Sequence, residues 1–350
     1  MSKVDDCARD AVMVKGDASN LPTAEKVVVK GFNWDDPDNK LADGGIDYKK
    51  MLDAYVTTGF QSTNMGLAIN EINRMIDHKL NGEYPENFDM EDFDCGTFTR
   101  PKSPCTIFYS FTSNLISSGA RDTIHYLCKH NMVDVVITTA GGIEEDFIKV
   151  LADTYMGSFS LDGKELRKNG MNRIANLIVP NDNYCKFENW ILPIFEVMAD
   201  MQDKQGIVWT PCAMIHHLGM EIGKLPRGEE SVWYWCYKNK IPVFSPAITD
   251  GSLGDMLYFF SYKRRLNVEI VQDLRLLNSI STRSAASGMI ICGGGLIKHH
   301  TCNANLMRNG AEYAVYINTA TDFDGSVGGD EISVKRLETV KKSLKNAENC

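Results

Sequence analysis

Short apolar runs recur along the chain, and each is followed by a polar loop and then by a segment with helical spacing. The runs at 106–109, 133–138, 242–246, 288–292 and 313–317 have the length and composition of buried strands. Strands that alternate with helices are typical of a parallel, doubly wound sheet. The pattern therefore predicts an α/β, Rossmann-like fold, with helices on both faces of a mainly parallel sheet.

The two ends of the chain lack this alternation. Residues 1–45 are polar and contain a cluster of Asp and Pro residues, which predicts an N-terminal arm. Residues 46–326 carry the alternation without an internal repeat or a break in composition, so we expect one α/β domain there. Residues 327–350 have the spacing of a short basic amphipathic helix or a frayed tail.

Composition and charge narrow the class of protein. Hydrophobic residues make up 43% and charged residues 24% of the 350 residues, which excludes a wholly disordered chain. The net charge of −9 argues against a protein that binds nucleic acid by neutralising phosphates, and it favours cationic ligands or basic partners. No run approaches the roughly 18 apolar residues of a membrane-spanning helix, so no membrane partner is expected.

Ten cysteines are spread along the chain, and none forms a Cys-x-x-Cys pair. The usual sequence sign of a zinc site or a redox pair is therefore missing. Side chains of the adjacent pairs His216-His217 and His299-His300 diverge on a helix or a strand, which disfavours metal ligation. Residues 1–30 hold several acids in place of a secretory signal. We therefore expect reduced thiols, no metal centre and a cytoplasmic location.

Acidic residues follow several of the predicted strands. They are Glu144, Glu145, Asp250, Asp255 and Asp324. Carboxyl ends of parallel strands meet at one edge of the sheet, so these side chains should converge there. Taken singly, an acid in the first turn of a helix most often answers the helix dipole. Five together would repel one another unless they share a cation, which predicts a site for a polyamine or another organic cation.

Two glycine-containing loops are expected at the same edge. Gly293-Gly294-Gly295 follows one strand, and Thr139-Ala140-Gly141-Gly142 follows another. Missing side chains let a cofactor or a phosphate approach the backbone, although a tight strand-to-helix turn has the same composition. Neither loop matches the Gly-x-Gly-x-x-Gly dinucleotide pattern. His299 adds a group that is able to move protons near neutral pH, or a residue that caps a helix.

Six segments together carry a resemblance to a known family. They lie at 57–61 (Thr-Thr-Gly-Phe-Gln), 112–119, 138–146, 180–188, 250–255 (Asp-Gly-Ser-Leu-Gly-Asp) and 293–305. The chain resembles deoxyhypusine synthase over about residues 56–326. The resemblance implies a cytosolic tetramer with NAD at a subunit interface, where an N-terminal arm covers the site. Such an enzyme oxidises spermidine and moves its 4-aminobutyl group, through an imine on an active-site lysine, to a lysine of translation factor 5A.

The resemblance also assigns ligand contacts by position. Those implied for NAD are Ser113, Asn114, Leu115, Ile116, Ser117, Thr139, Ala140, Gly141, Glu145, Asp250, Gly294, Thr319 and Ala320. Those implied for spermidine are Glu144, Glu145, Asp255, His299, Gly325 and Ser326. Carboxylates on the spermidine side agree with the cation site expected from the acidic residues alone.

The segment after residue 326 departs from the family pattern. Members of the family carry Gly-Ser-Asp and later Glu-Ala-Val-Ser-Trp-Gly-Lys, whose lysine is the nucleophile. In this chain Val327 replaces the aspartate, and residues 330–335 read Asp-Glu-Ile-Ser-Val-Lys, with no Trp-Gly and two residues fewer before the lysine. That deletion shifts an extended backbone by about 6–7 Å.

Lys335 is therefore a poor candidate for the nucleophile. Imine transfer needs reacting atoms within about 3.5 Å of each other. A nucleophilic lysine must also be neutral, usually through burial in an apolar pocket, and Arg336 adds charge beside it. We expect no other catalytic residue in this segment.

Three functions are compatible with these observations. The first is a regulatory subunit, a prozyme with no activity on its own, which activates an intact deoxyhypusine synthase paralogue in a hetero-oligomer, expected to be a tetramer. It would bind NAD and spermidine and reach translation factor 5A through the complex. The second is an active homotetrameric deoxyhypusine synthase that uses Lys335 or a lysine reached by domain exchange. The third is a non-enzymatic binder of translation factor 5A.

Overall fold

The structure is a computed structural model that describes residues 27–90 and 96–320. The chain divides into two compact units, Met1–Leu67 and Ala68–Cys350. The first unit contains the short helices η2 (Pro37–Asn39), α2 (Tyr48–Asp53) and α3 (Tyr55–Thr58) and the start of α4 (Phe60–Asn81). The predicted boundaries after residues 45 and 326 stay predictions.

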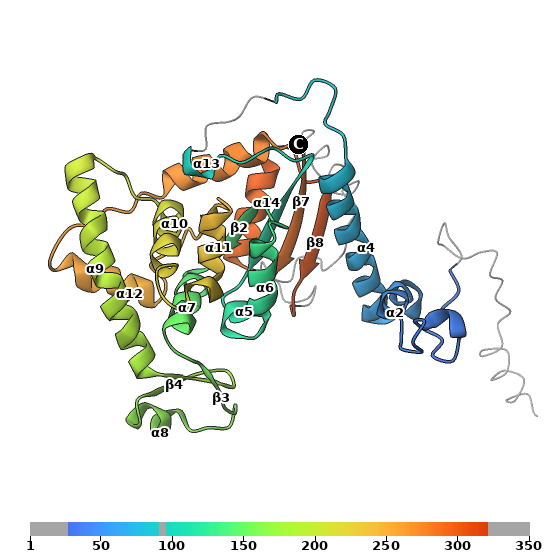
Figure 1. Cartoon of the computed structure of the whole chain (residues 1–350), viewed down its shortest axis with the longest axis horizontal. Coiled ribbons are helices and arrows are strands. Elements are labelled where there is room, and N and C mark those ends of the chain that lie inside the picture. The colour runs from blue at the N-terminus through green and yellow to red at the C-terminus, as the bar shows by residue number, and fades with distance from the viewer. Residues whose placement is uncertain (1–26, 91–95, 321–350) are drawn as a thin grey trace, which may run out of the picture. The chain divides into compact units, whose positions relative to one another are not determined.

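The second unit is built on a five-stranded sheet with the order β6-β2-β1-β7-β8 (Figure 1). Its strands are β1 (Cys105–Phe111), β2 (Val135–Thr138), β6 (Val243–Phe244), β7 (Ala286–Cys292) and β8 (Tyr313–Ile317). All four neighbouring pairs run parallel. The predicted doubly wound, parallel α/β fold is therefore confirmed. The first strand along the sequence, β1, lies in the middle of this sheet. Later strands are added first on one side of it (β2, β6) and then on the other (β7, β8), so the strand order reverses between β1 and β7.

Helices cover both faces of this sheet. One buried cluster joins the sheet to α6 (Ala120–Lys129), α7 (Ala140–Leu151), α9 (Asn181–Gln205), α10 (Pro211–Ile222), α11 (Val232–Lys238) and α12 (Ser252–Ser261). A second cluster joins the other face to α13 (Val271–Thr282) and α14 (Leu296–Leu306). Three further short pieces belong to loops, the helix α5 (Asn114–Ser117) and the turns η3 (Gly96–Phe98) and η4 (Gly228–Glu230). Apolar strand residues therefore have partners above and below the sheet, as continuous apolar runs require.

A small antiparallel sheet between α7 and α9 has no counterpart in the predicted pattern. It has the order β3-β5-β4, with β3 (Tyr155–Met156), β4 (Met171–Ile174) and β5 (Leu177–Pro180), and it lies beside α8 (Gly163–Lys168), as Figure 1 shows. Its strands are two to four residues long; β3 is exposed, while β4 and β5 are mostly half-buried or half-exposed and only Val179 of β5 is buried. The strands β3 and β4 lack an apolar run of the kind from which the main sheet was predicted, and the run of β5 was not singled out in the sequence.

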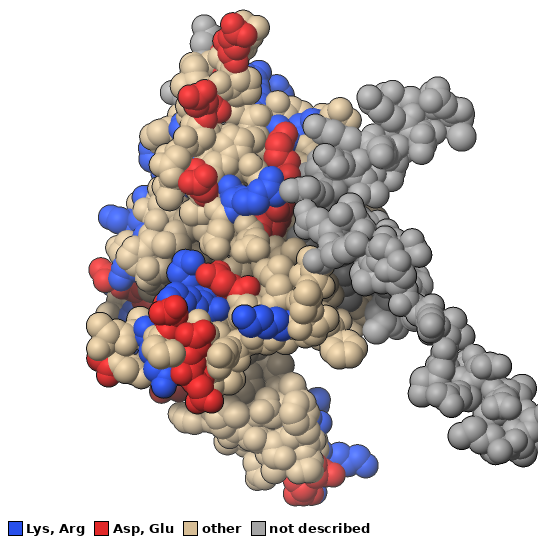
Figure 2. Space-filling model, turned by 90° about the vertical axis from the view of Figure 1, so that its right-hand side faces the viewer, with Lys and Arg blue, Asp and Glu red and all other residues tan. Residues whose placement is uncertain are grey.

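Charged side chains of both signs are interspersed on the face of the molecule shown in Figure 2. An extended basic surface, which nucleic-acid binding would need, does not stand out on that face. Over residues 27–90 and 96–320, no helix is long and apolar enough to cross a membrane. The same residues contain no group of three His, Cys, Asp or Glu side chains placed to hold a metal ion.

Candidate active site

The loops after β1 and β7 meet where the strand order reverses. Phe111 and Cys292 are paired at the ends of these strands, and Thr112 N–H donates to the Cys292 carbonyl over 3.2 Å. Gly293 has a φ of 116°, and a Cβ at this position would lie 2.7 Å from the Thr112 side chain. Only glycine fits both constraints. In open α/β sheets this crevice is where ligands bind.

The first turn of α7 packs against the loop after β1. A Cβ on Gly141 would lie 3.0 Å from Cβ of Ser113, so the two backbones approach closely. Beside them, the buried Oγ1 of Thr139 has no hydrogen-bond partner. A buried hydroxyl without a partner is costly unless a ligand pairs with it. Bare backbone and an unpaired hydroxyl at a helix N-terminus therefore fit a phosphate-containing cofactor such as NAD.

Glu145 lies on α7 and faces this loop. The Ser117 hydroxyl donates a hydrogen bond to Oε2 of Glu145, and Nζ of Lys149 donates to the Ser117 carbonyl over 2.5 Å. Burial raises the pKa of Glu145, while the Ser117 hydrogen bond and the Lys149 charge lower it. Burial also raises the pKa of the nearby Tyr184 phenol, and the charges of Glu145 and Glu144 raise it further.

Glu144, the preceding residue, faces the start of α12 instead. Its side chain is buried, with a relative exposure of 6%, and Leu253 N–H donates to Oε2 over 2.6 Å. Burial raises the pKa of Glu144 to about 7, and Glu145 and Asp255 raise it further, against the N–H groups of Leu253 and Ser252. A carboxyl group that titrates near neutral pH is suited to accept and return a proton.

The other predicted acids and the histidine lie at the surface of the same edge. Asp250 and Asp255 are exposed, just before and within the first turn of α12, and Asp255 is close enough to influence Glu144. His299 is exposed in the first turn of α14, where its N–H donates to the Gly295 carbonyl over 3.0 Å. Asp250 follows β6 and His299 follows β7, so both stay on the carboxyl side of the sheet.

The remaining predicted ligand contacts fall into three groups. Ile116 and Ala140 are fully buried, so any contact with a ligand is made by their backbone. Asn114, Leu115, Gly294, Thr319 and Ala320 lie in the loops that follow β1, β7 and β8. Gly325, Ser326, Lys335 and Asp324 lie outside the described residues. The contacts that the structure does show thus join two groups of residues, one around Glu145 and one around Glu144, and α7 carries both.

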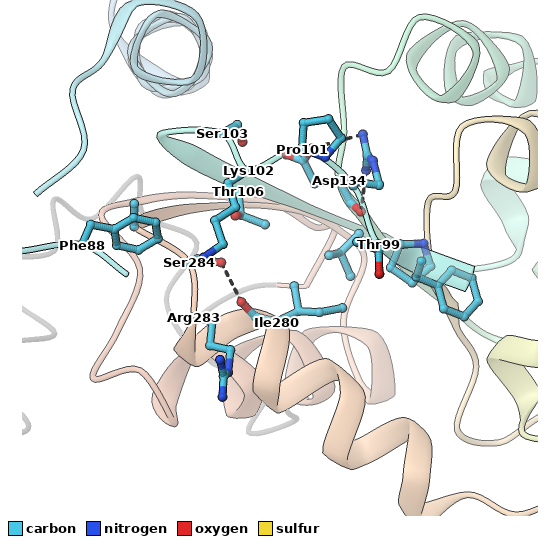
Figure 3. A pocket seen from close by; sticks show the side chains of 15 residues that line it. Phe88, Thr99, Pro101, Lys102, Ser103, Thr106, Asp134, Ile280, Arg283 and Ser284 are labelled. Atoms are coloured by element: carbon cyan, nitrogen blue, oxygen red, sulfur yellow. Dashed lines mark hydrogen bonds and ion pairs between the residues drawn. The ribbon is translucent and has the colours of Figure 1, made fainter. Parts of the chain in front are cut away.

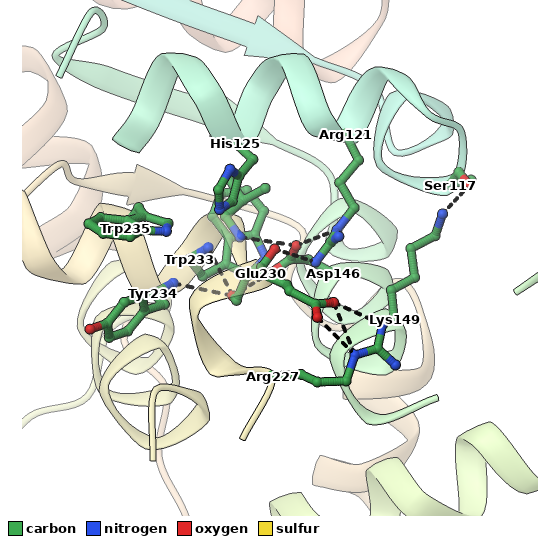
Figure 4. Close-up of polar contacts among 12 residues, drawn as sticks. Ser117, Arg121, His125, Asp146, Lys149, Arg227, Glu230, Trp233, Tyr234 and Trp235 are labelled. Atoms are coloured by element: carbon green, nitrogen blue, oxygen red, sulfur yellow. Dashed lines mark hydrogen bonds and ion pairs between the residues drawn. The ribbon is translucent and has the colours of Figure 1, made fainter. Parts of the chain in front are cut away.

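A buried ion pair fixes α7 in place (Figure 4). Asp146 is fully buried and accepts from Nε of Arg121 over 2.8 Å, from the Ser231 hydroxyl over 2.5 Å and from Val232 N–H over 3.1 Å. Arg121 also donates to the Glu230 carbonyl over 2.7 Å. These contacts tie α6 and the start of α11 to α7 at the residue next to Glu145. The sequence pattern did not single out this network or Lys149, although Lys149 lies four residues after Glu145, a spacing at which helix side chains are neighbours.

Replacing Arg121 with alanine should destabilise the protein by about 3–5 kcal/mol, because Asp146 is then left buried without its cationic partner. Urea unfolding of the purified protein measures this change. The matched control is Arg275→Ala, an exposed position on α13, where we expect a change below about 0.5 kcal/mol. Equal losses in both variants would contradict the structural role of the Arg121–Asp146 pair.

The family model of deoxyhypusine synthase matches residues 50–335. The chain belongs to the deoxyhypusine synthase family. A curated relative, the probable deoxyhypusine synthase of Drosophila melanogaster, is 51% identical over 330 residues, which cover 94% of this chain and 85% of the relative. Senecio vernalis provides two further relatives over 86% of this chain and 82% of each relative, a deoxyhypusine synthase (53% identical) and homospermidine synthase 1 (52%).

A solved structure from Entamoeba histolytica, provisionally named a deoxyhypusine synthase, has the same fold. Its TM-score is 0.59 at 33% identity, and the alignment covers 91% of this chain and 96% of that chain. The family and its place in hypusine biosynthesis are therefore shown, together with the α/β fold.

These comparisons correct one expectation from the sequence. The prediction that the chain has no activity on its own is wrong, since relatives about half identical over most of its length are named as deoxyhypusine synthases. That prediction rested on residues 327–335, while the similarity to these enzymes covers more than 300 residues. A few divergent residues in a segment outside the described structure do not outweigh it.

A hollow of about 120 Å³ lies at the opposite edge of the sheet and is not part of this site (Figure 3). It is lined by residues at the amino ends of β1, β2 and β7, among them Ser103, Asp134 and Ser284. The candidate site described above lies instead at the carboxyl ends of these strands. Within the hollow, Arg100 contacts Asp134 and Asn131, and Lys102 donates to the Asp89 carbonyl over 2.5 Å.

Proposed function

We propose that this chain catalyses the NAD-dependent transfer of the 4-aminobutyl group of spermidine to a lysine of translation factor 5A. One observation carries the proposal: the adjacent carboxyl groups of Glu144 and Glu145, both shielded from water, lie on α7 close to Gly141, which packs against the loop that follows β1. Two such groups suit a dication, because carboxylates that lose water without a cationic partner are costly.

The residues around Glu145 would hold NAD, which supplies a hydride acceptor when it is bound. Ser113, Gly141 and Thr139 offer backbone and hydroxyl contacts, and the Thr139 hydroxyl lacks another partner. On the other side, Glu144 and Asp255 would hold the ammonium groups of spermidine. Glu144 would also take up the proton that an amine gives up, because its pKa of about 7 places it near half ionisation at neutral pH.

The names of the relatives bear on the acceptor of the aminobutyl group. Relatives named deoxyhypusine synthase and homospermidine synthase match the chain equally well. The acceptor is therefore a protein lysine or a free diamine, and we favour the lysine because several relatives from plants, insects and fungi carry the first name.

The test is transfer from labelled spermidine by the purified full chain, with NAD and either translation factor 5A or a diamine as acceptor. We expect label on translation factor 5A only when NAD is present. Borohydride reduction during turnover should attach label to the chain itself, and Lys335→Ala tests whether that lysine carries it. Absence of transfer to both acceptors, although the substrates are intact, would contradict the proposal.

A second part of the test concerns assembly of this chain with another protein. We also propose that the chain assembles with a paralogue that carries the intact Trp-Gly-Lys segment, because Val327 and residues 330–335 depart from the family pattern. Activity of the mixture should exceed the sum of the separate activities. A strictly additive mixture would contradict this assembly, and binding of translation factor 5A without any turnover would favour a binding protein instead.

A further inference from the structure

Lys149 is connected to Glu145 of the candidate site through Ser117. Its ammonium group donates to the Ser117 carbonyl over 2.5 Å, and the hydroxyl of the same serine donates to Glu145. Ser117 is buried and its hydroxyl also lies 3.3 Å from the Ser113 carbonyl. Ser117 therefore has a lysine on its carbonyl and a glutamate on its hydroxyl, and it cannot move without affecting both.

Charges around this group come from three helices. Glu145 is faced by Lys149 on its own helix, and Tyr184 on α9 lies close to it and to Glu144. Lys149 is faced by Arg121 on α6, which opposes its positive charge, and by the acids Glu145, Asp146 and Asp122. Among the groups that act on Glu145, Lys149 is the cation that favours its ionised form.

The fold does not depend on Lys149 for the placement of α7. The buried Arg121–Asp146 pair and its bonds to the start of α11 hold the helix on another side. Lys149 itself is partly exposed, with an alkyl stem that methionine can replace in volume. A role for its charge can thus be separated from a role in folding.

We propose that Lys149 is a positioning residue, which holds Ser117 so that the serine hydroxyl keeps Glu145 negatively charged and turned toward the bound cofactor and polyamine. The inference rests on the proposed function, and it takes Glu145 to contact the polyamine as well as NAD, as the resemblance to the family implies. Without the ammonium group, Glu145 would take up a proton at a higher pH, and the protonated acid attracts a cation less.

Lys149→Met, Lys149→Arg and the exposed control Lys164→Met on α8 test this role. For Lys149→Met we expect the KM for spermidine to rise about tenfold near neutral pH, with kcat nearly unchanged, because Ser117 is then no longer held against Glu145 and the carboxylate loses its nearby cation. The defect should shrink toward alkaline pH, where Glu145 is ionised without help. Lys149→Arg should restore most of the affinity, and Lys164→Met should behave as wild type.

A second measurement does not require activity. Carbon-13 NMR titration of the Glu145 carboxyl should show a higher pKa in Lys149→Met than in the wild type or in Lys149→Arg. An unchanged Glu145 titration, or a KM defect that is equal at all pH values, would overturn the proposal. If the chain transfers no aminobutyl group, the proposed function fails, while the NMR result still decides the role of Lys149.

Discussion

Glu144→Gln should lower kcat/KM for aminobutyl transfer by about 10²- to 10³-fold, the usual contribution of a positioned acid–base group. Glutamine keeps an oxygen that can accept from Leu253 N–H, but it carries no charge and takes up no proton. In the wild type, kcat/KM should fall as the pH drops below about 7, because Glu144 then becomes protonated. The variant should lose that dependence. Steady-state kinetics from acid to alkaline pH measures both effects.

The same substitution should stabilise the protein at alkaline pH. Burial raises the folded-state pKa of Glu144 from 4.5 to about 7, so between these values the folded state binds more protons than the unfolded state. Stability contributed by this group is complete below the lower value and is lost as the pH rises through the higher one. We expect Glu144→Gln to gain about 3 kcal/mol over the wild type above pH 7 and almost nothing near pH 4.5. Urea unfolding at the two pH values measures this.

Glu83→Gln on the exposed segment after α4 is the control for both experiments. It should change neither turnover nor the pH dependence of stability. Full activity of Glu144→Gln would contradict a role for Glu144 in proton transfer. Equal stability of wild type and variant at both pH values would contradict the raised pKa of Glu144 in the folded state.

Gly251→Ala should abolish most of the activity by a different route. A Cβ on Gly251 would lie 2.7 Å from both carboxylate oxygens of Glu144, which is far inside van der Waals contact. Glu144 must therefore move away from Leu253 N–H, and a displacement of about 1 Å can cost about 100-fold in rate. Comparison of transfer rates with NAD affinity measures the effect, since the contacts around Glu145 are on the other side of α7 and should remain.

Gly163→Ala at the start of α8 is the matched control, because a Cβ there meets nothing within 4 Å. That variant should keep wild-type activity. Turnover near the wild-type rate in Gly251→Ala would show that the position of the Glu144 carboxylate does not limit the reaction.

Much of the site could be anticipated because strand ends are easy to place in a chain of this pattern. Glu144, Glu145 and Asp255 follow predicted strands closely, and the parallel sheet brings them to one edge. The different surroundings of Glu144 and Glu145 could not be anticipated. Glu144 is bound by the backbone of α12 and Glu145 by a serine of α5, and these contacts depend on how distant helices pack.

The same limit explains the residues that sequence reasoning missed. In the sequence, Lys149 is indistinguishable from any basic residue in the last turn of a helix. Gly251 is likewise indistinguishable from any glycine that precedes a helix. Their roles appear only when α7 lies beside α5 and α12. Conversely, the inference of an inactive chain weighted one visible motif, Trp-Gly-Lys, above an identity that extends over 330 residues of a related enzyme.

Glu144 and Glu145 are consecutive on one helix, so their side chains leave the helix axis about 100° apart. The single helix α7 thus directs one carboxyl group toward each of two neighbouring regions, the start of α12 and the loop that follows β1. Any rotation or translation of α7 would displace both carboxyl groups together. A distant substitution that disturbs α7 should therefore weaken the binding of the dinucleotide and of the polyamine in parallel. A substitution that weakens the binding of only one of the two ligands would instead act on the residues that contact that ligand.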